Sequence, residues 1–127
     1  MRAVIDASYF IEAIEHSNDA IFCGVFEASA PSLLPYEIWN VLLWKEKRGT
    51  LTEAQKVSVQ IVLDSILLEN GEWSDIYNLA RKHKLTFYDA SYLQLAIDKQ
   101  AALATYDKAL LTAASTEKVP LLQDCDF

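Results

Sequence analysis

The sequence predicts an α/β domain in which a mostly parallel sheet of four to five strands carries helices on both faces. Short apolar runs alternate with segments of helical periodicity that are long enough for crossover connections. The 127 residues contain no linker, repeat or low-complexity stretch. Hydrophobic residues make up 52% of the chain, with only 3 Gly and 3 Pro, so a core can form. We therefore expect residues 1–127 to form a single domain.

The first part of the chain predicts two strands, two short helices and the start of a longer helix. An apolar run at 4–5 is typical of a buried strand, and helical spacing over 8–28 predicts two helices that separate at Asn18-Asp19. The proline-bounded run at 30–35 predicts the second strand. Pro35 fits the first turn of the following helix, where its missing N–H has no helical partner anyway.

Helix signals dominate the rest of the chain. The helix after Pro35 ends at 45–49, with cations in its last turn and Gly at its end. A capping box at 52–55 begins a helix that we expect to reach Leu67. The stretch 69–73 carries no apolar strand pattern, which leaves a third strand there in doubt. The remaining expected elements are helices at 75–84, 86–97 and 107–114, and strands at 102–105 and 119–122.

Charge and composition exclude several classes. The formal net charge of −7 argues against long-range attraction to nucleic acid, although a local basic strip remains compatible with it. The sequence contains no uncharged apolar run of about 18 residues, so it predicts no membrane span. Asp6 follows the N-terminus too closely for a signal peptide. Cys23 and Cys125 have no disulfide or zinc-ligand spacing. We expect a cytoplasmic protein with no membrane partner.

Four acidic residues occupy related positions in this predicted fold. Asp6 ends the first strand, Glu37 follows the second, Asp89 begins a helix and Asp107 follows a later strand. The carboxyl ends of parallel strands meet at one edge of a sheet, so these side chains should converge there. Clustered carboxylates repel one another, and a hard divalent cation such as Mg²⁺ cancels that charge. Nearby helix N-termini should help to keep three of the acids ionised.

The same acids also have an ordinary structural interpretation. Asp6 and Asp107 suit helix N-caps, and Asp89 is the fourth residue of a Thr-x-x-Asp capping pattern. Glu37 is expected in the first turn of its helix, where acidic residues are favoured. Spacing alone therefore leaves both a metal site and plain helix capping open.

Five segments, in order along the chain, carry a resemblance to a known family. They are VIDAS at 4–8, EIWNVL at 37–42, LTFYDASYLQLA at 85–96, LATYDKAL at 103–110 and VPLL at 119–122. Together they resemble the PIN domain family of metal-dependent ribonucleases, and within it the VapC-like toxins of type II toxin–antitoxin systems. The bulky Tyr9 and Phe10 after the first acid, and Tyr106 before the last, depart from the pattern expected of the family.

The resemblance implies a PIN-like three-layer α/β/α fold and an endoribonuclease that hydrolyses RNA phosphodiester bonds with Mg²⁺ or Mn²⁺. It further implies RNA as substrate, a small antitoxin as partner, and a homodimer. The implied catalytic and metal-binding residues are Asp6, Glu37, Asp89 and Asp107, with Ser8, Asn40 and Thr105 orienting carboxylates or waters. Each of these three also has an ordinary structural interpretation. Ser8 can hydrogen-bond the nearby helix start, Asn40 can be a solvated helix residue, and Thr105 is a good strand former.

Two rival functions stay open. A catalytically silent PIN-like domain could bind RNA or protein without cleaving it. A haloacid-dehalogenase-like phosphohydrolase could use Asp6 as nucleophile, but the acid that it requires two residues on is Ser8 here.

Basic and aromatic residues suggest binding surfaces. We interpret His16 and His83 as ordinary surface residues, and expect core burial for at least half of the 3 Trp and 6 Tyr. The exposed rings would suit an interface. Candidates for a phosphate-contacting rim are Lys45, Lys47, Arg48, Lys82, His83, Lys84 and Lys108.

Overall fold

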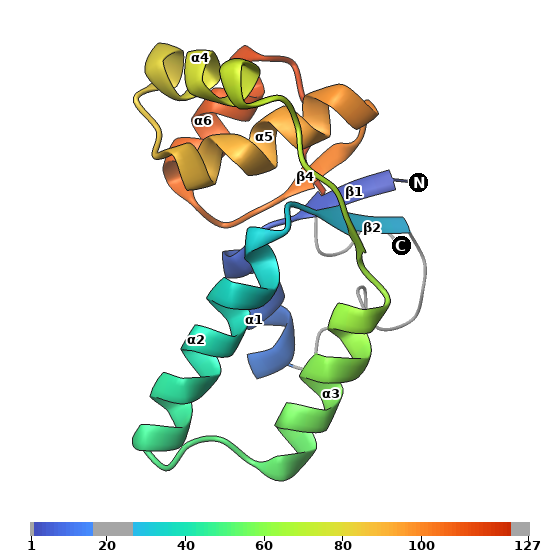
Figure 1. The fold of residues 1–127 in the computed structure, drawn as a ribbon, viewed down its shortest axis with the longest axis vertical. Helices are drawn as coiled ribbons and strands as arrows, with labels where there is room; N and C mark the ends of the chain where they lie inside the picture. Colours follow the sequence, from blue (N-terminus) through green and yellow to red (C-terminus); the bar gives the residue numbers. More distant parts are fainter. Residues whose placement is uncertain (1, 17–26, 123–127) are drawn as a thin grey trace.

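Four parallel strands form the central sheet in the order β3-β2-β1-β4, in a computed structural model that describes residues 2–16 and 27–122. The strands are β1 (Arg2–Ile5), β2 (Glu27–Ala30), β3 (Leu67–Leu68) and β4 (Ala102–Ala104). The helices are α1 (Ala7–Glu15), α2 (Leu33–Lys47), α3 (Glu53–Asp64), α4 (Trp73–His83), α5 (Phe87–Lys99) and α6 (Lys108–Thr116). Figure 1 shows α4, α5 and α6 on one side of the sheet and α1, α2 and α3 on the other. The three-layer α/β/α prediction is confirmed.

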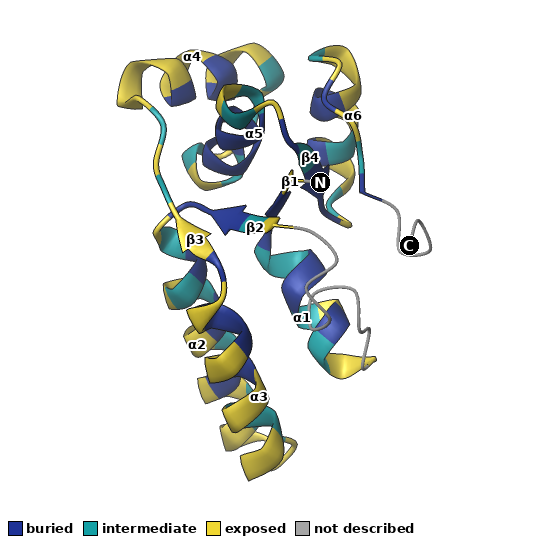
Figure 2. Ribbon diagram, turned by 90° about the vertical axis from the view of Figure 1, so that its right-hand side faces the viewer, coloured by how far each residue is buried: buried dark blue, intermediate teal, exposed yellow. Residues whose placement is uncertain are grey.

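The core lies on both sides of β1, the strand between β2 and β4. Ala3, Val4 and Ile5 are completely buried, and so is Leu103 of β4. Figure 2 shows the exposed residues on the outer faces of the helices, away from the sheet. Because both faces of β1 are covered, Asp6, which directly follows this strand, is held at the buried carboxyl end of the sheet.

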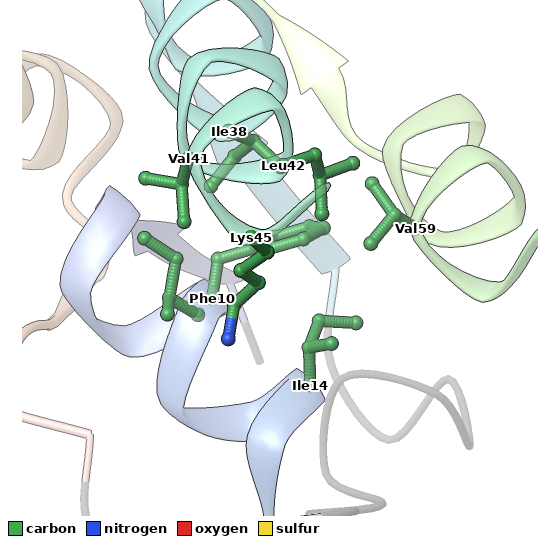
Figure 3. Close-up of a pocket in the computed structure, with 8 residues that line it drawn as sticks. Phe10, Ile14, Ile38, Val41, Leu42, Lys45 and Val59 are labelled. Carbon is green, nitrogen blue, oxygen red and sulfur yellow. The ribbon is translucent and has the colours of Figure 1, made fainter. Parts of the chain in front are cut away.

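Side-chain packing joins α1, α2 and α3, the helices on one side of the sheet. Phe10 and Ile14 of α1, Ile38 and Leu42 of α2, and Val59 of α3 line one apolar pocket (Figure 3). The ammonium group of Lys45 leaves this apolar pocket and donates to Glu15, with Nζ and Oε1 2.5 Å apart. This packing sets the relative position of α1 and α2, whose N-terminal parts carry Asp6 and Glu37.

The capping box of α3 forms as the sequence predicts. The Thr52 hydroxyl accepts from the N–H of Gln55 at 3.1 Å, and the Gln55 side chain accepts from the N–H of Thr52 at 3.1 Å.

We expect Thr52→Ala to lower the free energy of unfolding by about 1 kcal/mol, because one helix-start N–H loses its acceptor. Urea denaturation followed by circular dichroism measures this. Ser58→Ala, an exposed change within the same helix, is the control. Equal stability of Thr52→Ala and the wild type would show that the cap contributes nothing.

The second strand is shorter and earlier than predicted. The strand predicted at 30–35 is wrong: β2 spans Glu27–Ala30, where small residues pair with β1. Pro31 has no N–H for the ladder, and it ends the strand. Leu33 and Leu34 instead begin α2, which places Pro35 third in the helix, in its first turn as predicted.

The other edges of the sheet also differ from prediction. The helix predicted to reach Leu67 ends at Asp64, and Leu67–Leu68 form β3, an exposed strand of two residues beside β2. The last predicted strand is reduced to one bridge between Leu103 and Leu121, because Pro120 can accept from Leu103 but cannot donate. The described residues therefore hold four strands. The predicted break at 18–19, most of the helix after it, and both cysteines lie outside those residues. The predicted end of that helix at 27–28 is wrong, because these residues belong to β2 and pair with β1.

The prediction for the aromatic residues is wrong. Only Tyr9 and Tyr92 of the Trp and Tyr side chains are buried, and the other seven are exposed. The core is filled instead by aliphatic residues and Phe10, while most rings lie on outer helix faces. The Tyr106 ring stacks on Tyr9, with centroids 5.4 Å apart. In the part of the chain with described coordinates, no helix has the length and apolar character needed to cross a bilayer.

His83 is not the ordinary surface residue that the sequence suggested. Only 11% of its side chain is exposed, and its Nε2 lies 2.6 Å from Oε2 of Glu117. Lys82 donates to the same oxygen at 2.7 Å. The hydrogen bond from Lys82, followed by that from His83, lowers the pKa of Glu117. The cluster joins α4 to the end of α6.

We expect Glu117→Gln to be less stable than the wild type at pH 7, by on the order of 1 kcal/mol. Since the Glu117 pKa is lower in the folded than in the unfolded protein, its stabilisation is complete above the ordinary glutamate pKa. It is lost as the pH falls through the lowered value. Urea unfolding from pH 7 to pH 3 should show the two proteins converging on the acid side. A constant difference across that range would contradict the assignment.

Candidate metal centre

Asp6 is the most buried of the four candidate acids, with 4% of its surface exposed. It is the N-cap of α1, and its Oδ1 accepts from the N–H of Tyr9 at 2.9 Å. The Ser8 hydroxyl donates to the same oxygen at 2.7 Å, and the Thr105 hydroxyl donates to Oδ2. Both carboxylate oxygens are thus fixed by donors from two separate parts of the chain.

Thr105 links Asp6 to Asp107. Its hydroxyl oxygen accepts from the N–H of Asp107 at 3.0 Å while its proton is given to Asp6. Asp107 is the N-cap of α6 and accepts from the N–H of Leu110 at 3.0 Å. Ser8 closes the connection, since its oxygen accepts from the N–H of Tyr106 at 3.0 Å. The N-cap predictions for both aspartates are confirmed, and the caps face one another.

Glu37 comes from the other side of the site. It is the fifth residue of α2, so its predicted place in the first helical turn is wrong, because the helix begins at Leu33. The hydroxyl of Tyr92, on α5, donates to Oε1 of Glu37 at 2.6 Å. Sequence reasoning missed Tyr92 as a site residue. The available signal was its position three residues after Asp89, which places both on one face of a helix.

Asp89 lies in the first turn of α5 and is half-buried. Its N–H donates to the hydroxyl of Thr86 at 3.0 Å, so the predicted capping pattern is present. A side-chain hydrogen bond with Thr86 also lowers the pKa of the Asp89 carboxylate, and a carboxylate that accepts one such bond keeps lone pairs for other contacts. Capping and a metal-binding role are therefore compatible at this residue.

The electrostatics show that the four acids act on one another. Burial is the largest cause that raises the pKa of Asp6, Glu37 and Asp89 above the ordinary values. Repulsion adds to it: Asp107 raises the pKa of both Asp6 and Asp89, and Asp6 and Asp89 each raise that of Glu37. Donors at the start of α1 lower the Asp6 pKa, as expected of a helix N-terminus, but burial outweighs them. The four acids are therefore neighbours, although among the described residues only Glu12, Glu15 and His16 have three ligand atoms within 4.8 Å of one another.

This donor set fits a divalent cation. Carboxylate oxygens are the ligands that Mg²⁺ and Mn²⁺ prefer, and one ion would remove the repulsion that raises these pKa values. Hydroxyl groups that orient the ligands, as Ser8 and Thr105 orient Asp6, are the usual surroundings of such a site. Asn40 differs, because it lies exposed on α2 in a surface groove beside Trp39. No hydrogen bond joins it to the acids within the described residues.

A separate acidic group lies at the far end of α1. The ligand atoms of Glu12, Glu15 and His16 lie within 4.8 Å of one another, close enough to share one ion. All three residues are exposed, and the two glutamates already pair with His16 and Lys45. Because water solvates these exposed carboxylates, no cation is needed to offset the burial of their charge.

Comparison with known proteins identifies the family. The PIN domain family model matches residues 3–115. Among solved structures, PAE2754 from Pyrobaculum aerophilum is similar, with a TM-score of 0.71 and 30% identity over 89% of this chain and 87% of that chain. The PilT N-terminus domain protein SSO1118 from Sulfolobus solfataricus P2 shares the fold, with a TM-score of 0.53 and 15% identity over 98% and 87% of the two chains. No curated protein matches. PIN domains are generally nucleases that use divalent metals, and this chain belongs to the PIN domain family.

Proposed function

We propose that this protein is a Mg²⁺- or Mn²⁺-dependent endoribonuclease that hydrolyses RNA phosphodiester bonds. One observation carries the proposal: Asp6, Glu37 and Asp89 come from separate segments, and burial together with neighbouring acids, Asp107 among them, raises their pKa values. Keeping such a cluster has a free-energy cost, which functional sites commonly bear. All four acids implied by the family resemblance are retained in the sequence, which disfavours the catalytically silent alternative.

Each residue has a role in this scheme. Asp6, Asp89 and Asp107 would hold the cation, and Glu37 would either complete its shell through water or position the attacking water. The bound ion supplies positive charge that polarises the phosphodiester and makes water more acidic. Tyr92 fixes one oxygen of Glu37, while the other can accept a proton from water. The hydroxyls of Ser8 and Thr105 keep Asp6 from rotating.

The cations suit selective rather than general RNA binding. Of the proposed rim, Lys45 pairs with Glu15, and Lys82 and His83 pair with Glu117. Lys47 and Arg48 lie over the Trp44 ring. Lys84 and Lys108 complete the proposed rim. With few uncommitted cations and an acidic chain, we propose a particular structured RNA as substrate, recognised through shape and exposed loops.

The proposal includes a biological setting. We propose a cytoplasmic toxin of a toxin–antitoxin pair, silenced by a small antitoxin protein and active as a homodimer. Exposed apolar side chains on α2 support a protein partner, because Tyr36, Trp39 and Leu43 follow one another at helical spacing on its surface.

Cleavage of 5′-labelled RNA tests the function. We expect cleavage with Mg²⁺ or Mn²⁺ and none with EDTA, leaving 5′-phosphate and 3′-hydroxyl ends. Growth arrest on expression should be relieved by Asp6→Asn. RNA binding without cleavage under every metal condition would favour the silent binding module instead.

A further inference from the structure

A groove of about 460 Å³ lies where the N-terminal ends of α2, α4 and α5 meet the segment that follows β3. Its walls include Leu33, Asn70, Trp73, Phe87 and Tyr88. We call it the aromatic groove. None of its lining residues is charged, although the chain carries a net charge of −7. The groove therefore suits a neutral, apolar group better than a phosphate.

The rings in the aromatic groove are presented to solvent. Trp73 is 78% exposed and Tyr88 is 65% exposed. The Trp73 ring packs against Phe87, with centroids 5.9 Å apart and planes 31° from parallel. An exposed indole held in place by a second ring is a surface on which another flat ring can stack.

The rest of the wall is firmly built. Both polar atoms of the Asn70 side chain bond to Ser32. Asn70 Oδ1 accepts from the Ser32 N–H at 3.0 Å, and Asn70 Nδ2 donates to the Ser32 hydroxyl at 2.7 Å. At Gly71, an added Cβ would come within 3.0 Å of Asp98 Oδ2 and 3.2 Å of Gln94 Cγ. The segment after β3 is thus pinned to α2 and packed closely on α5, which gives the groove a fixed wall.

The groove shares two helices with the carboxylate cluster, although none of the four acids lines it. Tyr88 immediately precedes Asp89, and the hydroxyl of Ser91 donates to the Tyr88 carbonyl at 2.6 Å, which fixes this turn of α5. Leu33 is the first residue of α2, the helix that carries Glu37. A polymer with a phosphate at the acids would therefore bring an adjacent nucleoside to the aromatic groove.

We propose that the aromatic groove binds one unstacked nucleobase of the RNA, next to the phosphate that is cleaved. The proposal rests on the proposed ribonuclease function and names its substrate contact. Trp73 stacks on the base, Tyr88 borders it, and the neutral wall excludes the neighbouring phosphates. Single-stranded regions supply such bases, because a base held in a duplex presents no free face.

Binding of mononucleotides tests the groove without metal or turnover. In EDTA, adenosine and uridine 5′-monophosphate should quench tryptophan fluorescence, whereas ribose 5-phosphate should not. Trp73→Ala or Tyr88→Ala should weaken binding of an eight-nucleotide single-stranded RNA by about 5- to 150-fold. Trp73→Phe should restore most of it, which separates stacking from loss of structure. Tyr77→Ala, which removes an exposed ring on α4 that does not line the groove, should bind like the wild type.

RNA cleavage separates this proposal from the ribonuclease assignment. We expect Trp73→Ala to raise KM for single-stranded RNA with a smaller change in kcat. Unchanged KM in both Trp73→Ala and Tyr88→Ala, in an enzyme that cleaves RNA, would overturn the base site and leave the ribonuclease function intact. Base-dependent quenching in a protein that never cleaves RNA would support the groove and reject the ribonuclease. Loss of self-association in Trp73→Ala, without loss of RNA binding, would assign the groove to a second copy instead.

Discussion

Asp107→Asn should lower the rate of RNA cleavage by on the order of 1000-fold, because positive charge at the phosphate contributes several kcal/mol to the transition state. Asn keeps the side-chain oxygen that accepts from Leu110, so the cap of α6 and the fold should survive. What it removes is the negative charge that acts on Asp6 and Asp89. Single-turnover cleavage of labelled RNA in Mn²⁺ measures the effect.

Asp64→Asn is the matched control for this variant. Asp64 is exposed at the end of α3, where its side chain accepts from Gln60, and its replacement should leave the rate unchanged. Thermal unfolding of both variants checks that the fold is kept. Cleavage by Asp107→Asn at the wild-type rate would mean that Asp107 is a helix cap and nothing more.

Thr105→Val should weaken Mn²⁺ binding by about 10- to 100-fold, the usual effect of removing a group that orients a metal ligand. Valine keeps the shape of threonine but removes the proton given to Asp6 and the oxygen that accepts from the N–H of Asp107. Because the Thr105 hydroxyl lowers the Asp6 pKa, its loss should also raise that pKa further. Titration calorimetry with Mn²⁺ gives the affinity directly.

Thr112→Val provides the comparison, since Thr112 is exposed and its hydroxyl donates to the Lys108 carbonyl within its own helix. This variant should bind Mn²⁺ like the wild type. If Thr105→Val also binds Mn²⁺ with wild-type affinity, Asp6 does not need its buried donor, and the orienting role of Thr105 is wrong.

The positions of the acids could be predicted because they depend on local rules. Asp6 and Asp107 follow strands and cap helices, and parallel strands bring their carboxyl ends to one edge. Asp89 follows Thr86, whose capping pattern fixes the start of α5. In each case a short sequence pattern decides the backbone, and the topology then decides the meeting point.

The contacts between distant segments could not be predicted in the same way. Nothing local to Tyr92 shows that its hydroxyl will meet Glu37, 55 residues away. The same holds for His83 and Glu117, which meet only once α4 and α6 are packed. Periodicity places a polar tip on a helix face, but the partner comes from tertiary packing.

The strand errors have a different cause. Leu67–Leu68 form too short a run to be recognised, and their side chains are exposed, so neither length nor burial pattern marks a strand. At 30–35, the apolar Leu33 and Leu34 suggested a strand although they begin α2, with Leu34 on its buried face. Short apolar runs do not distinguish strand from helix without their neighbours.

Anomalous diffraction from crystals soaked in Mn²⁺ tests most directly whether the four acids form one cation site. The account predicts manganese bound by carboxylate oxygens of Asp6, Asp89 and Asp107, with Glu37 beside it or joined through water. Carboxylates that lie apart with no manganese between them would contradict it. So would manganese found only at the exposed group of Glu12, Glu15 and His16.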